Sequence, residues 1–324
     1  MICIDMRFRT EIKPLRSFPK LDPEKPLLFL GSCFAENIGN RLRTMLWGAS
    51  VNPAGILFNP LSILRSLETA EIPSETRISI IEQTLVERDG LFYSLLTDTS
   101  VYGSTPDELC EKVNQAFETL KKDVTETQAV IITLGTAYVY RWAQTGEVVA
   151  NCHKLPEHLY LRERINIEEC EEALTGIITV IRKMNPGADV IMTVSPVRHL
   201  RDGFEENSRS KATLLLAAGN LAEKKQIAYF PAFEIMMDDL RDYRFYGRDL
   251  AHPSDEAVEY IKDIFLDSAV STESRKLLDE AEALARRAAH RPLDPDSDNA
   301  IRFMAETQKL KMEFAGKHPG MLHI

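Results

Sequence analysis

Five short apolar runs recur along the chain, and polar segments with helical periodicity separate most of them. The runs are rich in β-branched and aromatic residues and are bounded by Gly, Pro or Asn, which is typical of buried strands. They occupy residues 26–30, 49–58, 129–135, 188–195 and 227–233. Their continuous apolar character, without alternation, indicates strands that are covered on both faces.

Helix-like stretches lie between or after these runs. Their apolar residues recur at the three- and four-residue spacing of an amphipathic helix. The stretches span residues 35–47, 106–122, 167–184, 208–225 and 255–268. Repetition of strand, helix and strand predicts an α/β fold whose parallel sheet carries helices on both faces.

Two segments interrupt this alternation with hairpin patterns. Asp89-Gly90 stands between apolar flanks within residues 78–96, and Thr145-Gly146 stands within residues 138–150. Such dipeptides favour the tight turns that join antiparallel strands. We therefore expect two hairpin insertions at the rim of the sheet.

The pattern changes after Val270 to charged helical segments separated by a Pro- and Asp-rich break. About fifty residues bury little core alone, so such a tail packs against its own domain or a second subunit. We divide the chain into a domain at residues 1–270 and a helical extension at 271–324. The extension could support a homo-oligomer.

Composition excludes several classes of function. The 324 residues carry 39 Lys and Arg against 49 Asp and Glu, a formal charge of −10, and no basic tract. Phosphate-backbone binding needs clustered positive charge, so nucleic acid is not an expected partner. No apolar run reaches the length of a membrane span, and residues 1–15 are too interrupted by charge for a signal peptide. We expect a soluble, cytoplasmic protein.

The five cysteines are odd in number and lack CxxC spacing, which indicates reduced thiols. One of them, Cys33, follows Ser32 in the turn after the first predicted strand. Ligands bind beyond the carboxyl ends of parallel strands, where a helix amino terminus can lower a thiol pKa or hold an oxyanion. Taken alone, however, the pattern also fits a capping serine and a small buried cysteine.

A second polar stretch follows the last predicted strand. Asp249 and His252, spaced D-x-x-H before a helix, can place a carboxylate against an imidazole and raise its basicity. The order is a nucleophile after the first strand and a carboxylate and base after the last. In one parallel sheet, that order strengthens the interpretation of these residues as a nucleophile, an orienting acid and a base.

These features resemble the SGNH, or GDSL-like, hydrolases, and "GSCFA" at residues 31–35 resembles the GSCFA family within them. "LGTAYVYRW", "VVANCHKLP", "SPVRHLRDG" and "DLAHPS" extend the resemblance over about residues 8–265. The resemblance implies a three-layer α/β sandwich of SGNH or flavodoxin-like type, with a central, mostly parallel five-stranded sheet. It also implies hydrolysis or transfer of an acyl group on an oxygen ester, with no cofactor.

The resemblance assigns roles to particular residues. Asp249 and His252 match the orienting acid and the general base, and Gly55 lies where relatives place an oxyanion-hole N–H. Gapless matching of "GSC" to "GDS" puts Cys33 on the nucleophile, while serine-to-serine matching favours Ser32. We therefore keep both as candidates.

One position departs from the family pattern. Relatives carry an Asn two residues after the glycine that ends the third strand, and Ala137 stands there instead. Thr136, Asn52 or Asn151 could donate to the oxyanion in its place. Asn151 is the preferred substitute, because it follows the second hairpin and could fold back over the rim of the sheet.

Further polar residues follow the fourth predicted strand. Arg198 and His199 lie at the edge of the sheet where substrate is expected, and Arg198 or Arg201 could bind a carboxylate or phosphate. Cys152, His153 and His158 match no standard zinc spacing, so no metal is expected.

We predict an esterase of SGNH type that acts on an acyl or acetyl ester of a small molecule or a carbohydrate. An O-acyltransferase with the same residues, or a catalytically inactive binding protein derived from such an enzyme, remain alternatives.

Overall fold

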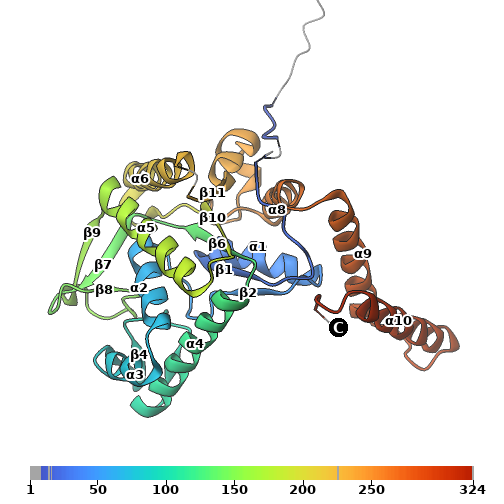
Figure 1. Cartoon of the computed structure of the whole chain (residues 1–324), viewed down its shortest axis with the longest axis horizontal. Helices are drawn as coiled ribbons and strands as arrows, with labels where there is room; N and C mark the ends of the chain where they lie inside the picture. Colours follow the sequence, from blue (N-terminus) through green and yellow to red (C-terminus); the bar gives the residue numbers. More distant parts are fainter. Residues whose placement is uncertain (1–8, 14, 16, 225, 323–324) are drawn as a thin grey trace, which may run out of the picture.

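A computed structural model describes residues 9–322 apart from residues 14, 16 and 225 (Figure 1). Cys3 lies outside the described residues, and so does most of the segment 1–15 that was considered as a signal peptide. Within the described part of the chain, no helix is long and apolar enough to cross a membrane.

All five predicted apolar runs contribute strands to one sheet, and every pair of neighbours in it is parallel. After the first strand, the chain forms the second strand at one edge of the sheet. The three later strands are then added on the other side of the first strand, so the strand order reverses there. Open α/β sheets bind ligands outside such a switch point, at the carboxyl ends of the strands. In order across the sheet the strands are β11 (Ala228–Phe230), β10 (Asp189–Val194), β6 (Ala129–Leu134), β1 (Leu27–Gly31) and β2 (Ala49–Val51).

Side chains of β1 divide alternately between two cores. Leu27 and Phe29 pack in a cluster with α1 (Cys33–Thr44) and α8 (Asp255–Ala269). Leu28 and Leu30 face the opposite way, into a cluster with helices on the other side of the sheet. Those helices are α2 (Pro60–Glu71), α4 (Pro106–Glu126), α5 (Ile167–Met184) and α6 (Gly203–Glu223). The predicted three-layer α/β sandwich is thereby confirmed.

The predicted strand at residues 49–58 is wrong over most of its length. Strand β2 ends at Val51, and the following apolar residues form a loop in which Ala54 and Leu57 are buried. A second helix, α2, begins at Pro60 with Asn59 as its cap, and α3 (Ser74–Glu82) follows. Neither helix was predicted.

Both predicted hairpins are confirmed. Strands β3 (Leu85–Arg88) and β4 (Leu91–Ser94) are antiparallel, and Asp89 and Gly90 between them both adopt positive φ. Strands β7 (Tyr138–Trp142) and β8 (Val148–Val149) form the second. Each hairpin gains a third strand, which was not predicted: β5 (Tyr102–Gly103) and β9 (Tyr160–Arg164).

The C-terminal extension consists of α9 (Thr272–Ala289) and α10 (Asp298–Lys317). Leu278 and Leu284 of α9 and Phe314 of α10 belong to the same core cluster as α1 and α8. Self-association through these helices stays a prediction.

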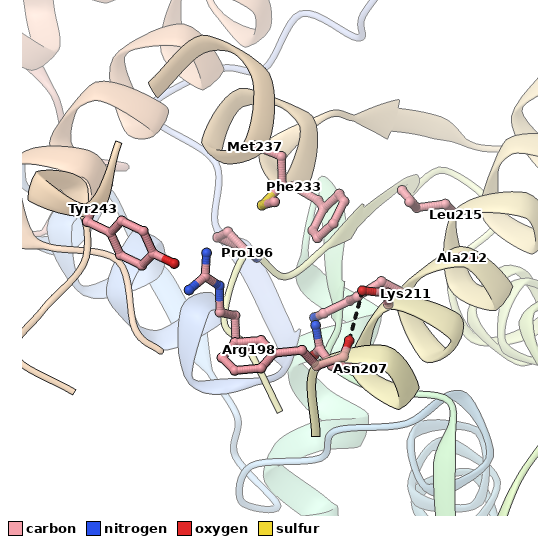
Figure 2. Close-up of a pocket in the computed structure, with 11 residues that line it drawn as sticks. Pro196, Arg198, Asn207, Lys211, Ala212, Leu215, Phe233, Met237 and Tyr243 are labelled. Atoms are coloured by element: carbon pink, nitrogen blue, oxygen red, sulfur yellow. Dashed lines mark hydrogen bonds between the residues drawn. The ribbon is translucent and has the colours of Figure 1, made fainter. Parts of the chain in front are cut away.

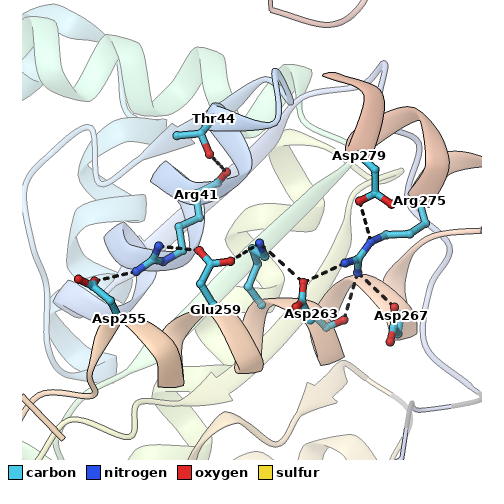
Figure 3. Close-up of polar contacts among 9 residues, drawn as sticks. Arg41, Thr44, Asp255, Glu259, Asp263, Asp267, Arg275 and Asp279 are labelled. Carbon is cyan, nitrogen blue, oxygen red and sulfur yellow. Dashed lines mark hydrogen bonds and ion pairs between the residues drawn. The ribbon is translucent and has the colours of Figure 1, made fainter. Parts of the chain in front are cut away.

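A chain of ion pairs fixes α8 between α1 and α9 (Figure 3). The Arg41 guanidinium lies 2.8 Å from the Asp255 carboxylate and 2.6 Å from that of Glu259. Farther along α8, Asp263 lies 2.9 Å from Arg275 of α9. Because Asp255 opens α8, the network also holds the start of this helix, three residues after His252.

Candidate functional site

The turn after β1 lies directly against the end of β6. Gly31 has φ +125°, and a Cβ there would fall 2.1 Å from the Thr133 carbonyl oxygen. The next residue, Ser32, donates its N–H to the same oxygen at 3.0 Å. Only glycine allows this approach, so Gly31 fixes where α1 begins.

Ser32 and Cys33 occupy different environments. Ser32 is fully buried, and its Oγ accepts from the Phe34 N–H at 3.3 Å, which makes it the cap of α1. Cys33 is the first residue of the helix and is partly exposed. Of the two adjacent side chains, Cys33 is therefore the accessible one.

The helix start does not lower the pKa of the Cys33 thiol in this structure. Burial, and after it the Glu36 carboxylate, raise the pKa of the Cys33 thiol above its ordinary value. The charge of Lys211 and the N–H groups of the first turn act in the opposite direction without prevailing. At neutral pH Cys33 is therefore a thiol, and chemistry at its sulfur needs a base to remove the proton.

Lys211 is the most unusual group near the site. Its side chain is buried, and the ammonium donates to the carbonyl oxygens of Gly135 at 2.7 Å and Ser195 at 2.6 Å. These residues directly follow β6 and β10, so the lysine joins the carboxyl ends of two strands. Burial lowers its pKa to about 7.

This lowered pKa predicts how stability depends on pH. Between about 7 and the ordinary value of 10.5, the unfolded chain holds a proton on Lys211 that the folded chain has lost. Raising the pH through this window therefore stabilises the fold. Denaturant unfolding should measure the free energies of unfolding of the wild type and of Lys211→Met. As the pH rises from 7 to 10, the wild type should gain stability relative to Lys211→Met by up to about 1.4 kcal/mol per pH unit. A difference that stays constant from pH 7 to pH 10 contradicts the assignment.

The D-x-x-H turn closes on itself. One oxygen of Asp249 accepts from the N–H groups of Ala251 and His252, both at 3.0 Å, and the other lies 2.6 Å from His252 Nδ1. The two N–H groups, followed by the imidazole, hold the pKa of Asp249 well below its usual range. Asp249 is therefore ionised at neutral pH and orients the imidazole, leaving Nε2 for proton transfer.

Backbone contacts place this turn before α8. Gly247 donates its N–H to the His252 carbonyl oxygen at 2.7 Å, and Ser254 donates to that of Phe245 at 2.7 Å. Ser254 then caps α8. The turn is rigid although the Asp249 and His252 side chains are about half exposed, 53% and 50%. Among the described residues, no hydrogen bond joins His252 to Cys33.

The loop after β2 is built around Asn52 and Asp98. Asn52 Oδ1 accepts from the Gly31 N–H at 2.9 Å, and the Asp98 carboxylate accepts from the Ile56 N–H at 3.0 Å. The Gly55 N–H donates to the Asn52 carbonyl oxygen at 2.8 Å, so it is not free to bind an oxyanion in this arrangement. Asn52 Nδ2, by contrast, is buried without a partner among the described residues.

Thr136 and Asn151, the two other predicted oxyanion donors, both make contacts within the fold. The Thr136 N–H donates to the Phe58 carbonyl oxygen at 2.9 Å, and its hydroxyl lies 3.0 Å from Ser210 Oγ. Asn151 Oδ1 accepts from the His153 N–H at 2.8 Å. Both residues thus have structural partners.

Arg198 and His199 follow β10, as predicted. The Arg198 N–H donates to the Ala251 carbonyl oxygen at 3.1 Å, which places Arg198 against the D-x-x-H turn. The His199 ring contacts Phe58, and its Nε2 is buried without a partner among the described residues. Burial, and then the charges of Lys211 and His252, lower the pKa of His199 to about 4, so it is neutral at pH 7.

The residues considered for a metal serve the hairpin region. His153 is buried, stacks on Tyr93, and places Nε2 2.8 Å from the Ser94 carbonyl oxygen. In the part of the chain that the structure describes, no three His, Cys, Asp or Glu side chains gather as a metal site.

Sequence reasoning missed Lys211 and Asp98. Lys211 lies within an amphipathic helical pattern, where a lysine usually reaches solvent. Its one available signal was an apolar neighbourhood in the sequence, "KATLLLAA". Asp98, after the first hairpin, had no distinguishing signal.

The fold and the site together define a doubly wound α/β protein. Its candidate nucleophile follows the first strand of the parallel sheet, and its Asp–His pair follows the last strand. The family model described as "GSCFA family" matches residues 26–265. The chain belongs to the GSCFA family, as the "GSCFA" motif predicted.

Other comparisons are more distant. No curated protein matches the chain. Among solved structures, an acetyl xylan esterase from the rumen bacterium Butyrivibrio proteoclasticus is 12% identical, with 81% of this chain and 65% of that one covered and a TM-score of 0.37. A carbohydrate esterase family 3 structure from Talaromyces cellulolyticus is 11% identical, with 51% and 65% covered and a TM-score of 0.29. Likenesses this weak carry no argument about activity.

Proposed function

We propose that the protein is an esterase of SGNH type that cleaves a small acyl ester through Cys33, His252 and Asp249. The observation that carries the proposal is the Asp249–His252 pair, with 2.6 Å between Oδ2 and Nδ1, in a turn held rigid before α8. An ionised carboxylate that fixes an imidazole serves proton transfer. The carbohydrate or acetyl nature of the ester is part of this proposal.

Cys33 is the proposed nucleophile because Ser32 is buried and its hydroxyl already caps α1. Its raised thiol pKa fits a mechanism in which a base removes the proton as the sulfur attacks. His252 is that base, and it reaches the sulfur when substrate orders the site. Catalytic hydrogen bonds are often absent without substrate and form in the substrate complex.

The proposed reaction has two halves. Cys33 Sγ attacks the ester carbonyl carbon while His252 Nε2 takes the thiol proton, and the alcohol then leaves with that proton, which gives an acyl thioester. Water attacks the thioester carbonyl, His252 takes a proton from it, and the Cys33 sulfur leaves and recovers the proton. The acid is released and the enzyme is restored.

Negative charge on the carbonyl oxygen needs donors. The Cys33 N–H opens α1 and has no acceptor within the helix, and Asn52 Nδ2 is a buried donor with no partner in the part of the chain that the structure describes. Buried unsatisfied donors are rare and call for a function. We assign Asn52, in place of Gly55, Thr136 or Asn151, as the side-chain donor to the oxyanion.

Covalent capture tests the proposal. Mixing the protein with p-nitrophenyl acetate should release nitrophenol, and intact-mass and peptide analysis after an acid quench should find an acetyl group on the Cys33 peptide. Acetyl transfer to an added alcohol in preference to water would identify an acyltransferase. If no activated ester gives an adduct or turnover, the binding-protein alternative replaces the esterase.

A further inference from the structure

A pocket of about 260 Å³ opens beside the proposed site, between α6 and the helical segments α7 (Ala232–Glu234) and 235–240 (Figure 2). Its walls are largely apolar and include Phe204, Leu215, Phe233 and Met237. Two cationic residues, Arg198 and Lys211, also line it. The pocket therefore suits a molecule with an apolar body and a polar end.

Hydrogen bonds connect this pocket to the proposed base. Besides its N–H contact with the Ala251 carbonyl oxygen, Arg198 donates from Nη1 to the Leu250 carbonyl oxygen at 3.2 Å. Leu250 and Ala251 are the two residues between Asp249 and His252. A molecule held by Arg198 would therefore lie next to the D-x-x-H turn.

The charges that line the pocket have one sign. None of the described residues that line it is acidic, although the whole chain has a formal charge of −10. Among the described residues, neither Arg198 nor Lys211 forms an ion pair with a carboxylate. Backbone carbonyl oxygens accept hydrogen bonds from both cations, but no carboxylate compensates their positive charge, so this pair favours a bound anion.

The Arg198 guanidinium is positioned for such an anion. It stacks over the Tyr246 ring at 4.0 Å from the centroid, with the rings of Tyr243 at 5.6 Å and Phe204 at 6.0 Å. Stacking occupies the faces of the guanidinium and leaves its in-plane N–H groups for acceptors. Figure 2 shows it projecting toward the region between Tyr243 and Met237.

We infer that this pocket binds an oxyanion group, a carboxylate or a phosphate, carried on a short apolar stem, with Arg198 and Lys211 as its counter-charges. If this group is part of the substrate, which rests on the proposed function, the enzyme should prefer esters that carry a negative charge near the scissile bond. Binding of the anion itself does not depend on catalysis.

Calorimetric titration with three probes tests the inference. The probes are 3-phenylpropionate, its neutral isostere 3-phenylpropanamide, and phenyl phosphate, at pH 6 and low salt, where Lys211 is protonated. We expect the wild type to bind the better of the two anions at least tenfold more tightly than the amide. Whether phenylpropionate or phenyl phosphate binds more tightly identifies the group.

Variants separate this site from general charge effects. Arg198→Gln should abolish the preference for the anion, Arg198→Lys should retain part of it, and Arg302→Gln on the exposed face of α10 should leave it intact. Cys33→Ala should bind the anion as the wild type does, so a failed esterase proposal leaves this result standing. Equal affinity for the acids and the amide, or a preference that survives Arg198→Gln in a protein that melts normally, overturns the inference.

Discussion

Cys33→Ala should abolish ester turnover, with a fall of roughly 10³-fold or more, because no other side chain in the turn can form the thioester. Ser32→Ala should instead lower stability by about 1 kcal/mol through loss of the α1 cap, while retaining most of the activity. Steady-state hydrolysis of an activated ester, with thermal melts of each variant, measures both effects. The reverse pattern would assign the reaction to Ser32.

Alkylation gives an independent readout of the same residue. Because burial and Glu36 raise the pKa of Cys33, iodoacetamide should modify it slowly at pH 7 and faster as the pH rises. Inactivation should follow modification of the Cys33 peptide in time. Cys110→Ala, which removes a partly buried thiol from α4, is the matched control and should be inactivated at the wild-type rate. Activity that survives full modification of Cys33 excludes it as the nucleophile.

The parallel sheet was predictable because each of its strands lies in a short, continuous apolar run, which is typical of a strand covered on both faces. Residues 52–58 show the limit of this reasoning. Ala54 and Leu57 are buried as strand residues would be, but the backbone hydrogen bonds are made with tertiary partners, such as the Gly31 carbonyl oxygen that accepts from the Leu57 N–H at 3.1 Å. Because the predicted strand ran to residue 58, the start of α2 was missed, although Asn59 and Pro60 are the usual signal of a helix N-terminus.

The candidate site likewise contains local contacts that the sequence could predict and long-range contacts that it could not. The Asp249–His252 turn lies within four residues, so its spacing could indicate the contact. Lys211 reaches partners 76 and 16 residues away, and no local pattern encodes that arrangement. The pKa of Cys33 is a similar case, because the local helix start favours the thiolate while burial, a property of the whole fold, prevails.

His252→Ala should lower hydrolysis by roughly 10³-fold or more, because the raised pKa of the Cys33 thiol leaves little thiolate to attack unaided. The fold should be nearly unaffected, since the imidazole is half exposed. Replacing the exposed His158 by Ala is the control, and it should leave both the rate and the melting temperature unchanged. Full activity in His252→Ala would remove the base from the mechanism.

Asp249→Asn separates orientation of the imidazole from the geometry of the turn. Asn Oδ1 can still accept from the Ala251 and His252 N–H groups, so the turn should persist. The amide NH₂ would then face His252 Nδ1, which would have to accept, and the ring proton would move to Nε2, where a base is needed. We expect a rate loss of roughly 10³- to 10⁴-fold with an unchanged melting temperature. A loss that appears only together with a lower melting temperature would assign Asp249 a structural role instead.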